Sequence, residues 1–279
     1  MKIEVICPLY KGEKYILDLV DSINNQVDVE NVKIKFILTD TGDKSEEILK
    51  NNNLEYEKIL PKDFSHSLTR EKAALNSDSD IVVFITQDIE IVDNKWLYNL
   101  TKDIKGDVVA AYSRQVTKYD NIEKYTREKN YPETSKIVSK DDIKELGLKT
   151  FFFSDASSAI STKIFKELNG YDGKNLPISE DMYIAYKIIM NDYKIKYAAD
   201  SVVFHSHNFK LKELYDRYKL TGKFFKQNSY LDQYGTTSSG ASLAKYVLKR
   251  IFQEKRFLLL FRYPFDMAAR LIGMKVGKR

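Results

Sequence analysis

The segment that most constrains the fold is residues 80–87, which contain a near-continuous apolar run, Ile-Val-Val-Phe-Ile. A strand that is apolar at successive positions has to be covered on both faces, as the central strands of parallel sheets are. Further strands are predicted at residues 3–9, 33–38, 55–60 and 107–115. Segments with helical spacing of apolar residues separate the first four strands. This alternation predicts an α/β fold with a mostly parallel sheet flanked by helices.

The second half of the chain has a less regular and mainly helical pattern. Two short strands are expected near residues 194–198 and 201–205, and the polar residues 118–149 are expected to form helices and loops. The predicted helices are residues 13–26, 44–52, 67–77, 162–169, a segment after residue 179, 210–228, 241–254 and much of 257–274.

The composition excludes several classes of protein. Cys7 is the single cysteine, so the chain can form neither an internal disulfide nor a cysteine metal cluster. No run of 18 apolar residues exists that would span a membrane, and residues 1–5 contain an acid and do not resemble a signal peptide. A cytoplasmic setting is therefore expected. The glycine motifs of dinucleotide-binding proteins, P-loop enzymes and α/β-hydrolases are all missing.

A Ser/Thr/Gly-rich linker at residues 235–240 predicts a boundary between a large domain, 1–235, and a helical tail, 241–279. The tail holds ten Lys or Arg and two acidic residues, although the whole chain carries a formal charge of only +5. Its mixture of basic and large apolar residues is typical of a helix that lies in a membrane interface. The alternatives are packing on the large domain or a homodimer. The large aliphatic residues argue against nucleic-acid binding.

Three candidate residues lie at or just after the carboxyl ends of predicted strands. Ligands of parallel α/β sheets bind beyond the carboxyl ends of the strands, where the chain has Pro8, Asp40 and Asp88. If the chain stays extended, Asp88 and Glu90 point to the same side. Carboxylate oxygens at this place suit a hard divalent cation such as Mg²⁺ or Mn²⁺, which can neutralise a leaving diphosphate. The alternative is an ordinary acidic residue that ends a strand.

Two further pairs of residues could carry chemistry. Glu180 and Asp181 lie in the first turn of a predicted helix, with Ser179 as the candidate N-cap. They suit either a general base for a hydroxyl group or simply the positive end of a helix dipole. His205 and His207 close a predicted strand, where neutral imidazoles could bind a divalent ion or form a chance surface pair.

His66 and Arg70 lie where a loop opens a predicted helix. Backbone amides at a helix N-terminus, together with an arginine, suit a phosphate group. The alternative is an ordinary helix cap with a solvated arginine.

The order of these motifs resembles glycosyltransferase family 2, with a GT-A fold, and most closely its bacterial rhamnosyltransferase branch. The resemblance spans roughly residues 1–225 and is carried by seven segments: 5–10 (Val-Ile-Cys-Pro-Leu-Tyr), 40–43 (Asp-Thr-Gly-Asp), 64–71 (Phe-Ser-His-Ser-Leu-Thr-Arg-Glu), 85–88 (Ile-Thr-Gln-Asp), 152–160 (beginning Phe-Phe-Ser-Asp), 179–181 (Ser-Glu-Asp) and 203–209 (Val-Phe-His-Ser-His-Asn-Phe). Ser67 and Glu71 stand where the branch has Gly and Asn, and residues 161–162 where it often has two arginines. These departures bear on the sugar and acceptor more than on the reaction.

The resemblance implies a role for each matched residue. Asp88 would bind the metal, Mg²⁺ or Mn²⁺, with His205 or His207 as a further ligand. Asp181, beside Glu180, would be the catalytic base. The expected donor-binding residues are Pro8, Tyr10, Asp40, His66, Arg70, Gln87 and Asp88, and the expected acceptor-binding residues are Asp155 and Ser157.

The implied function is inverting transfer of a sugar, L-rhamnose, from a dTDP- or UDP-sugar to a glycan or lipid-linked acceptor in cell-surface polysaccharide synthesis. Such an enzyme is expected in the cytoplasm, peripheral on the inner face of the cell membrane. Two other functions stay open. A nucleotidyltransferase that makes nucleotide sugars would need a Gly-rich basic loop where residues 8–12 read Pro-Leu-Tyr-Lys-Gly. A non-catalytic protein that binds glycans or nucleotide sugars would have no reason to keep both Asp88 and Asp181.

Overall fold

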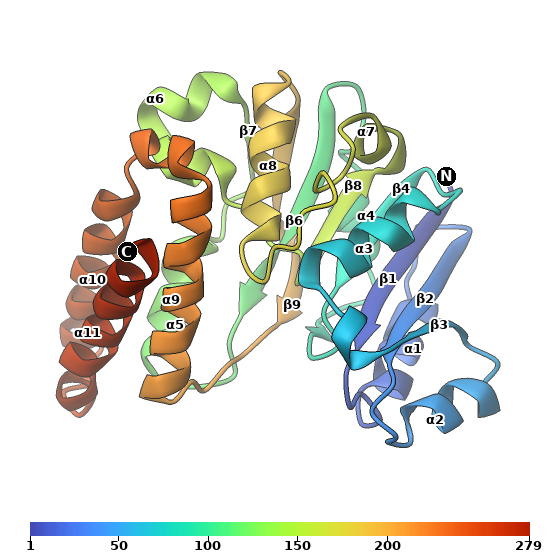
Figure 1. Cartoon of the computed structure of the whole chain (residues 1–279), viewed down its shortest axis with the longest axis horizontal. Coiled ribbons are helices and arrows are strands. Elements are labelled where there is room, and N and C mark those ends of the chain that lie inside the picture. The colour runs from blue at the N-terminus through green and yellow to red at the C-terminus, as the bar shows by residue number, and fades with distance from the viewer.

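A nine-stranded sheet forms the centre of the computed structural model (Figure 1). Residues 1–235 and 240–279 are described in full, and residues 236–239 by their backbone alone. The strands are β1 (Ile3–Leu9), β2 (Val32–Thr39), β3 (Glu55–Ile59), β4 (Ile81–Ile85), β5 (Glu90–Ile91), β6 (Val108–Val116), β7 (Lys136–Val138), β8 (Ser157–Ser161) and β9 (Lys194–Phe204). Their order is β3-β2-β1-β4-β8-β6-β9-β5, with β7 also paired to β9. The first four strands of this order are parallel, β8 is antiparallel to both neighbours, and β6 and β9 are parallel.

Helices cover both faces of the sheet, as the apolar run in β4 requires. They are α1 (Ile16–Asn24), α2 (Ser45–Asn51), α3 (His66–Leu75), α4 (Trp96–Thr101), α5 (Ile122–Asn130), α6 (Ile143–Leu146), α7 (Thr162–Glu167), α8 (Glu180–Met190), α9 (Leu211–Gln227), α10 (Thr236–Gln253) and α11 (Leu259–Lys278), with 3₁₀ turns at Pro61–Asp63, Lys140–Asp142, Gly147–Phe151 and Ser229–Tyr234. Val82 and Phe84 pack in one core with α3, α7 and α8. Ile81, Val83 and Ile85 pack in the other with α1, α2 and α4. The predicted α/β architecture is confirmed.

Four parts of the sheet differ from the prediction. The short strands β5 and β7 were not predicted, and β7 lies in the segment 118–149 that was expected to form helices and loops. β8 lies in the middle of the sheet, although its sequence, Ser-Ser-Ala-Ile-Ser, has no apolar pattern that predicts a strand. The two short strands expected near residues 194–198 and 201–205 are one strand, β9. Its pairing with β6 shifts register between Ala198 and Val202. The polar residues between these two positions interrupt the apolar pattern, so the sequence predicted two strands.

The C-terminal tail packs on the rest of the chain, and Figure 1 shows α10 and α11 beside α9 and α5. Val247 and Ile251 of α10 share an apolar cluster with Ile122 and Tyr125 of α5. The linker predicted at residues 235–240 falls mainly on 236–239, whose side chains lie outside the described residues. Within the described part of the chain, no helix has the length and apolar character needed to cross a membrane.

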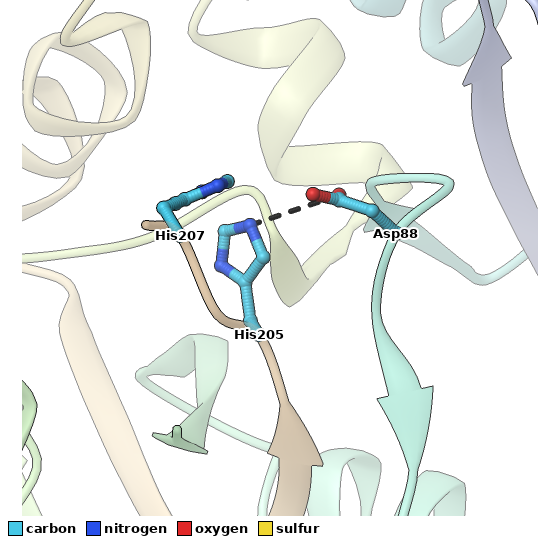
Figure 2. A group of neighbouring side chains, drawn as sticks. All are labelled: Asp88, His205 and His207. Atoms are coloured by element: carbon cyan, nitrogen blue, oxygen red, sulfur yellow. Dashed lines mark ion pairs between the residues drawn. The ribbon is translucent and has the colours of Figure 1, made fainter. Parts of the chain in front are cut away.

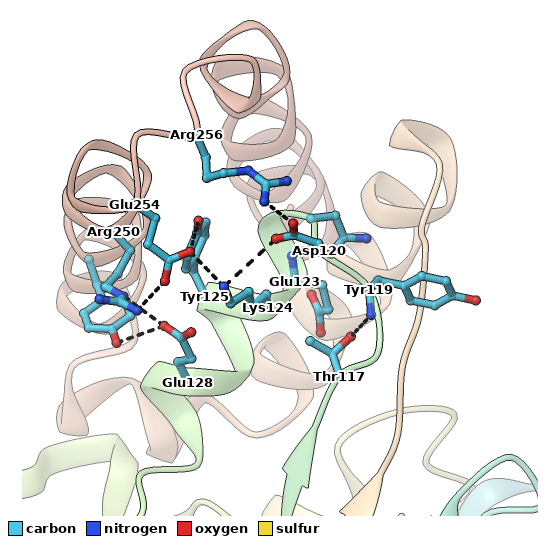
Figure 3. Close-up of polar contacts among 12 residues, drawn as sticks. Thr117, Tyr119, Asp120, Glu123, Lys124, Tyr125, Glu128, Arg250, Glu254 and Arg256 are labelled. Atoms are coloured by element: carbon cyan, nitrogen blue, oxygen red, sulfur yellow. Dashed lines mark hydrogen bonds and ion pairs between the residues drawn. The ribbon is translucent and has the colours of Figure 1, made fainter.

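Ion pairs reinforce the contact between α10 and α5 (Figure 3). Arg250 Nε lies 3.0 Å from Glu128 Oε2, and Lys124 Nζ lies 2.7 Å from Glu254 Oε2. Packing on the large domain, one of the alternatives open for the tail, is therefore observed.

Candidate active site

The three predicted metal ligands lie together, although they are far apart in the sequence (Figure 2). Asp88 follows β4, and His205 and His207 follow β9. One possible ligand atom from each residue lies within 4.8 Å of the others. The short strand β5 pairs with the end of β9, with Glu90 opposite Phe204. Because Asp88 lies just before β5 and the histidines just after β9, this pairing brings them close together.

The chemistry of this cluster fits a divalent cation. His205 Nε2 lies 3.7 Å from Asp88 Oδ1, close enough for both to reach one ion. Burial, followed by the charge of Arg127, lowers the pKa of His205 well below its usual value, so the imidazole is neutral and able to act as a ligand. Burial also lowers the pKa of His207. Two neutral imidazoles and a carboxylate are a set that binds divalent metal ions. Metal binding itself stays a prediction.

Glu180 and Asp181 open α8, and their surroundings differ. Glu180 is buried, and its Oε1 lies 3.6 Å from Arg70 Nη1 in a buried ion pair. Burial, then the charges of Glu180 and Asp155, raises the pKa of Asp181 well above its usual value. Ser179 is the N-cap residue of α8, as predicted, but its φ of 63° lies in the left-handed region and its side chain accepts no capping hydrogen bond.

Asp181 and His205 line the same cavity, which has a volume of about 200 Å³. Three arginines from three helices also face it: Arg127 of α5, Arg217 of α9 and Arg270 of α11. A carboxylate with a raised pKa beside a metal-ligand cluster is an arrangement typical of a general base. Guanidinium groups in a cavity are suited to bind an anionic ligand.

The predicted donor-binding residues lie along the carboxyl ends of the parallel strands. Gln87, next to Asp88, holds the loop after β1: its Oε1 accepts from the Tyr10 amide at 2.8 Å, and its Nε2 donates to the Tyr10 carbonyl at 2.9 Å. Pro8 is in β1 itself. Asp40 directly follows β2 and lies 3.2 Å from Lys58 Nζ. Pro8, Asp40 and Asp88 therefore lie at the carboxyl ends of the parallel strands, as their positions relative to the predicted strands indicated.

Arg70 faces the protein interior, whereas the side chain of His66 is exposed. Arg70 is only 2% exposed, pairs with Glu180 and donates a hydrogen bond to the His66 carbonyl at 2.9 Å. A direct phosphate contact by Arg70 remains a prediction that this geometry does not favour.

The two predicted acceptor-binding residues are both buried. Asp155 accepts hydrogen bonds from Ser158 at 2.8 Å and from Tyr171 at 2.7 Å, and burial raises its pKa to about 6. Ser157 lies in the core, 3.1 Å from Trp96 Nε1. Acceptor contacts by Asp155 and Ser157 remain predictions, and in this structure they would require neighbouring side chains to move.

Several residues around the cavity belong to no sequence motif. Gln115 lies 2.9 Å from His205 Nδ1, and Arg127, Arg217 and Arg270 line the cavity. One signal was available for Gln115, because it ends the predicted strand 107–115 and ligand-facing residues gather at strand ends. The three arginines lie on helices that are far apart in the sequence, and nothing in the sequence shows that these helices pack around one cavity.

Comparison with solved structures shows that the fold is of the GT-A type, the fold of nucleotide-sugar-dependent glycosyltransferases. The mannosyltransferase PcManGT from Pyrobaculum calidifontis, in complex with GDP-Man and Mn²⁺, has a TM-score of 0.69 at 14% identity, covering 99% of this chain and 86% of that one. S. aureus TarS 1-349, in complex with UDP-GlcNAc, has a TM-score of 0.58 at 16% identity, covering 99% and 91%. The predicted GT-A fold is confirmed.

The chain belongs to glycosyl transferase family 2, whose model matches residues 4–169. It is 31% identical over 287 aligned positions to the O-antigen chain rhamnosyltransferase RfbN of Salmonella typhimurium, covering 100% of this chain and 90% of the relative. It is 34% identical over 227 positions to the O-antigen chain rhamnosyltransferase WbaN of Salmonella anatum, covering 79% and 71%. The chain is therefore a glycosyltransferase, and the prediction of its family is confirmed.

Proposed function

We propose that this chain transfers L-rhamnose, with inversion, from a dTDP- or UDP-linked donor to a glycan or lipid-linked acceptor in cell-surface polysaccharide synthesis. The names of the two relatives, both O-antigen chain rhamnosyltransferases, support the sugar and the process. One observation carries the reaction: Asp181 lines the same cavity as His205, beside the cluster with Asp88.

The proposed mechanism is a single displacement. A divalent cation held by Asp88, His205 and His207 would neutralise the charge that develops on the departing diphosphate. Imidazole ligands favour Mn²⁺ over Mg²⁺, which prefers oxygen. The Asp181 carboxylate takes the proton of the acceptor hydroxyl, and that oxygen bonds to the anomeric carbon as the bond to phosphate breaks on the opposite face. The raised pKa of Asp181 makes its ionised form a stronger base.

The test uses purified full-length protein with dTDP-rhamnose and Mn²⁺. Asp181→Asn should lower transfer by about 10²–10⁴-fold, the usual contribution of a general base. It should still be stabilised by the donor in a thermal-shift assay, because donor binding does not need the base. Transfer by Asp181→Asn at near wild-type rate would show that the base is another residue. Activity that survives EDTA would rule out the metal role of Asp88.

A membrane attachment is proposed for the tail, residues 241–279, alongside a catalytic domain of residues 1–235. Large apolar side chains are exposed to solvent at the N-terminal end of α11: Leu258 is 83% exposed, Phe261 78% and Phe265 61%. Lys249 and Lys255 lie exposed on the neighbouring segment. Apolar side chains beside cations suit the interface of an anionic bilayer, which fits a lipid-linked acceptor and a place on the inner face of the cell membrane.

Co-sedimentation with phosphatidylglycerol vesicles tests this attachment. Phe261→Ser/Phe265→Ser should lose most of the bound fraction. Leu60→Ser, which removes an exposed apolar side chain far from the tail, should not. Equal binding by all proteins would contradict the proposal. A concentration-dependent dimer by light scattering, lost in the double variant, would instead assign the same face to a homodimer.

A further inference from the structure

The imidazole of His205 is held on the side away from Asp88 by a buried glutamine at the end of β6. β6 and β9 are parallel neighbours, so Gln115 lies beside the end of β9, and its Oε1 is 2.9 Å from His205 Nδ1. The same oxygen accepts a hydrogen bond from Arg127 Nη1. Gln115 Nε2 donates to Ser154 Oγ at 2.8 Å. The amide therefore has a partner at each end.

These contacts fix which atom of the amide faces the ring. A guanidinium donates hydrogen bonds and cannot accept them, so the Gln115 atom that meets Arg127 has to be oxygen. Arg127 is itself held by Glu123, which accepts from its Nε at 3.1 Å. Because the same amide oxygen meets His205 Nδ1 and has no hydrogen to donate, Nδ1 has to carry the proton. In a neutral ring Nε2 is then unprotonated, and Nε2 is the atom 3.7 Å from Asp88 Oδ1.

We infer that Gln115 is a positioning residue that holds His205 in the Nδ1–H tautomer, so that its Nε2 lone pair faces the space shared with Asp88 and His207. Outer partners of this kind orient the histidines of metal sites, and their loss lowers metal affinity by about 10–100-fold. The use of this tautomer for cation binding rests on the proposed function. The tautomer itself is a property of the folded chain alone.

The tautomer can be read directly by long-range ¹H–¹⁵N correlation spectroscopy of full-length protein labelled with [¹⁵N]histidine, without cation, donor or acceptor. The chain has three histidines, so the spectrum is simple, and His205→Asn assigns the signals of residue 205. Wild type should show His205 protonated at Nδ1 only. Gln115→Met should lose this preference, whereas Gln115→Glu should keep it because a carboxylate also accepts from Nδ1. Protonation of wild-type His205 at Nε2, or at both nitrogens, would overturn the inference.

Binding of Mn²⁺, measured by electron paramagnetic resonance of the free ion, supplies the second readout. Gln115→Met should bind Mn²⁺ about 10–100-fold more weakly, and Gln115→Glu within a few-fold of wild type. Gln26→Met is the matched control, because Gln26 also makes several hydrogen bonds, but its partners, Ser22, Asp93 and Leu97, are not residues of the cation cluster or the cavity. It should leave the tautomer and the Mn²⁺ affinity unchanged.

A merely structural role for Gln115 predicts another result. Gln115→Met would then melt at lower temperature and keep both the tautomer and the Mn²⁺ affinity, which would overturn the inference. Gln115→Val, which suits a strand, replaces the methionine variant if that does not fold. Since the tautomer is recorded without substrates, a protein that proves inactive in sugar transfer still answers this question.

Discussion

Replacement of Gly222 by alanine tests whether α11 is an integral part of the folded enzyme. α9 and α11 approach so closely at this glycine that a Cβ on it would lie 2.4 Å from the Met274 carbonyl oxygen, 2.9 Å from Gly277 Cα and 3.0 Å from the Lys278 amide nitrogen. All three atoms belong to the backbone of α11, so no side-chain rotation can relieve the contact. An ordinary contact begins at 3.4 Å, and α11 therefore has to move by about 1 Å.

The expected cost follows from two opposing effects. Overpacking of this kind costs about 1–3 kcal/mol. Alanine is the better helix former, which returns about 1 kcal/mol. Gly222→Ala should therefore lower the free energy of unfolding by up to about 2 kcal/mol. Gly240→Ala is the matched control, because no described atom lies within 4 Å of a Cβ at Gly240 in α10, and only the helix gain of about 1 kcal/mol applies.

Thermal unfolding followed by circular dichroism measures both variants. Each kcal/mol shifts the melting temperature of a chain of this size by about 2–4 °C, so Gly222→Ala should melt below wild type and Gly240→Ala slightly above it. Gly222→Ala should also lose transfer activity, because α11 supplies Arg270 to the cavity. If Gly222→Ala melts at or above the temperature of Gly240→Ala, the close contact between the helices is not present in solution.

Three other predictions follow from buried charges. Because burial raises the pKa of Asp181, kcat/KM should rise with pH along an acid limb whose midpoint lies above 3.8, the ordinary value; a pH–rate profile measures it. The pKa of Asp155 is about 6 in the folded chain and 3.8 ordinarily, so the folded state binds the proton more tightly than the unfolded state does. The protonated Asp155 therefore stabilises the fold fully below about pH 4, and this stabilisation is lost as the pH rises through 6. Urea unfolding of Asp155→Asn should lack that contribution, about 3 kcal/mol across this range, when compared with wild type. Arg70→Met should lower the free energy of unfolding by about 3–5 kcal/mol, because it leaves Glu180 buried without its ion-pair partner; an unchanged urea midpoint would contradict this.

The parallel half of the sheet could be predicted from the sequence because each of its strands carries its own apolar signal. In β4, successive residues such as Val83 and Phe84 enter opposite cores, which is why the apolar run is continuous. β8 could not be predicted, because its serines satisfy their hydroxyls inside the fold. Ser157 lies 2.6 Å from Ser113 Oγ and 3.1 Å from Trp96 Nε1, so polar residues occupy a central strand at little cost.

The residues of the candidate site also differ in how well the sequence predicts their positions. Asp88, His205 and His207 end strands, and topology alone places such residues at one edge of the sheet. Gln115 ends a predicted strand, but its contact with His205 depends on the pairing between β6 and β9, which the sequence does not show. The place of Arg127 depends on the docking of α5, which leaves no local signal. The sequence could therefore predict that the proposed cation ligands lie together, but not which side chains surround them.

Only part of the positive charge of the tail is available to an external partner. Several of its basic residues pair with acids inside the protein, as Arg250 does with Glu128 and Arg270 with Glu123. Among the described residues, the exposed tail lysines that form no ion pair are Lys245, Lys249, Lys255 and Lys275. Each lysine near an anionic surface contributes about 1 kcal/mol, so these four lysines together supply at most about 4 kcal/mol, or roughly a 10³-fold preference for anionic over neutral vesicles.

Changing all four lysines to glutamine should remove that preference while leaving the weaker binding that depends on Phe261 and Phe265. Vesicle co-sedimentation at matched ionic strength, with phosphatidylglycerol and with phosphatidylcholine, separates the two contributions. A quadruple variant that still prefers anionic vesicles by 10³-fold would mean that the paired arginines attract the membrane as well. The internal ion pairs would then be opening at the membrane surface, and the docked position of the tail would not be its bound position.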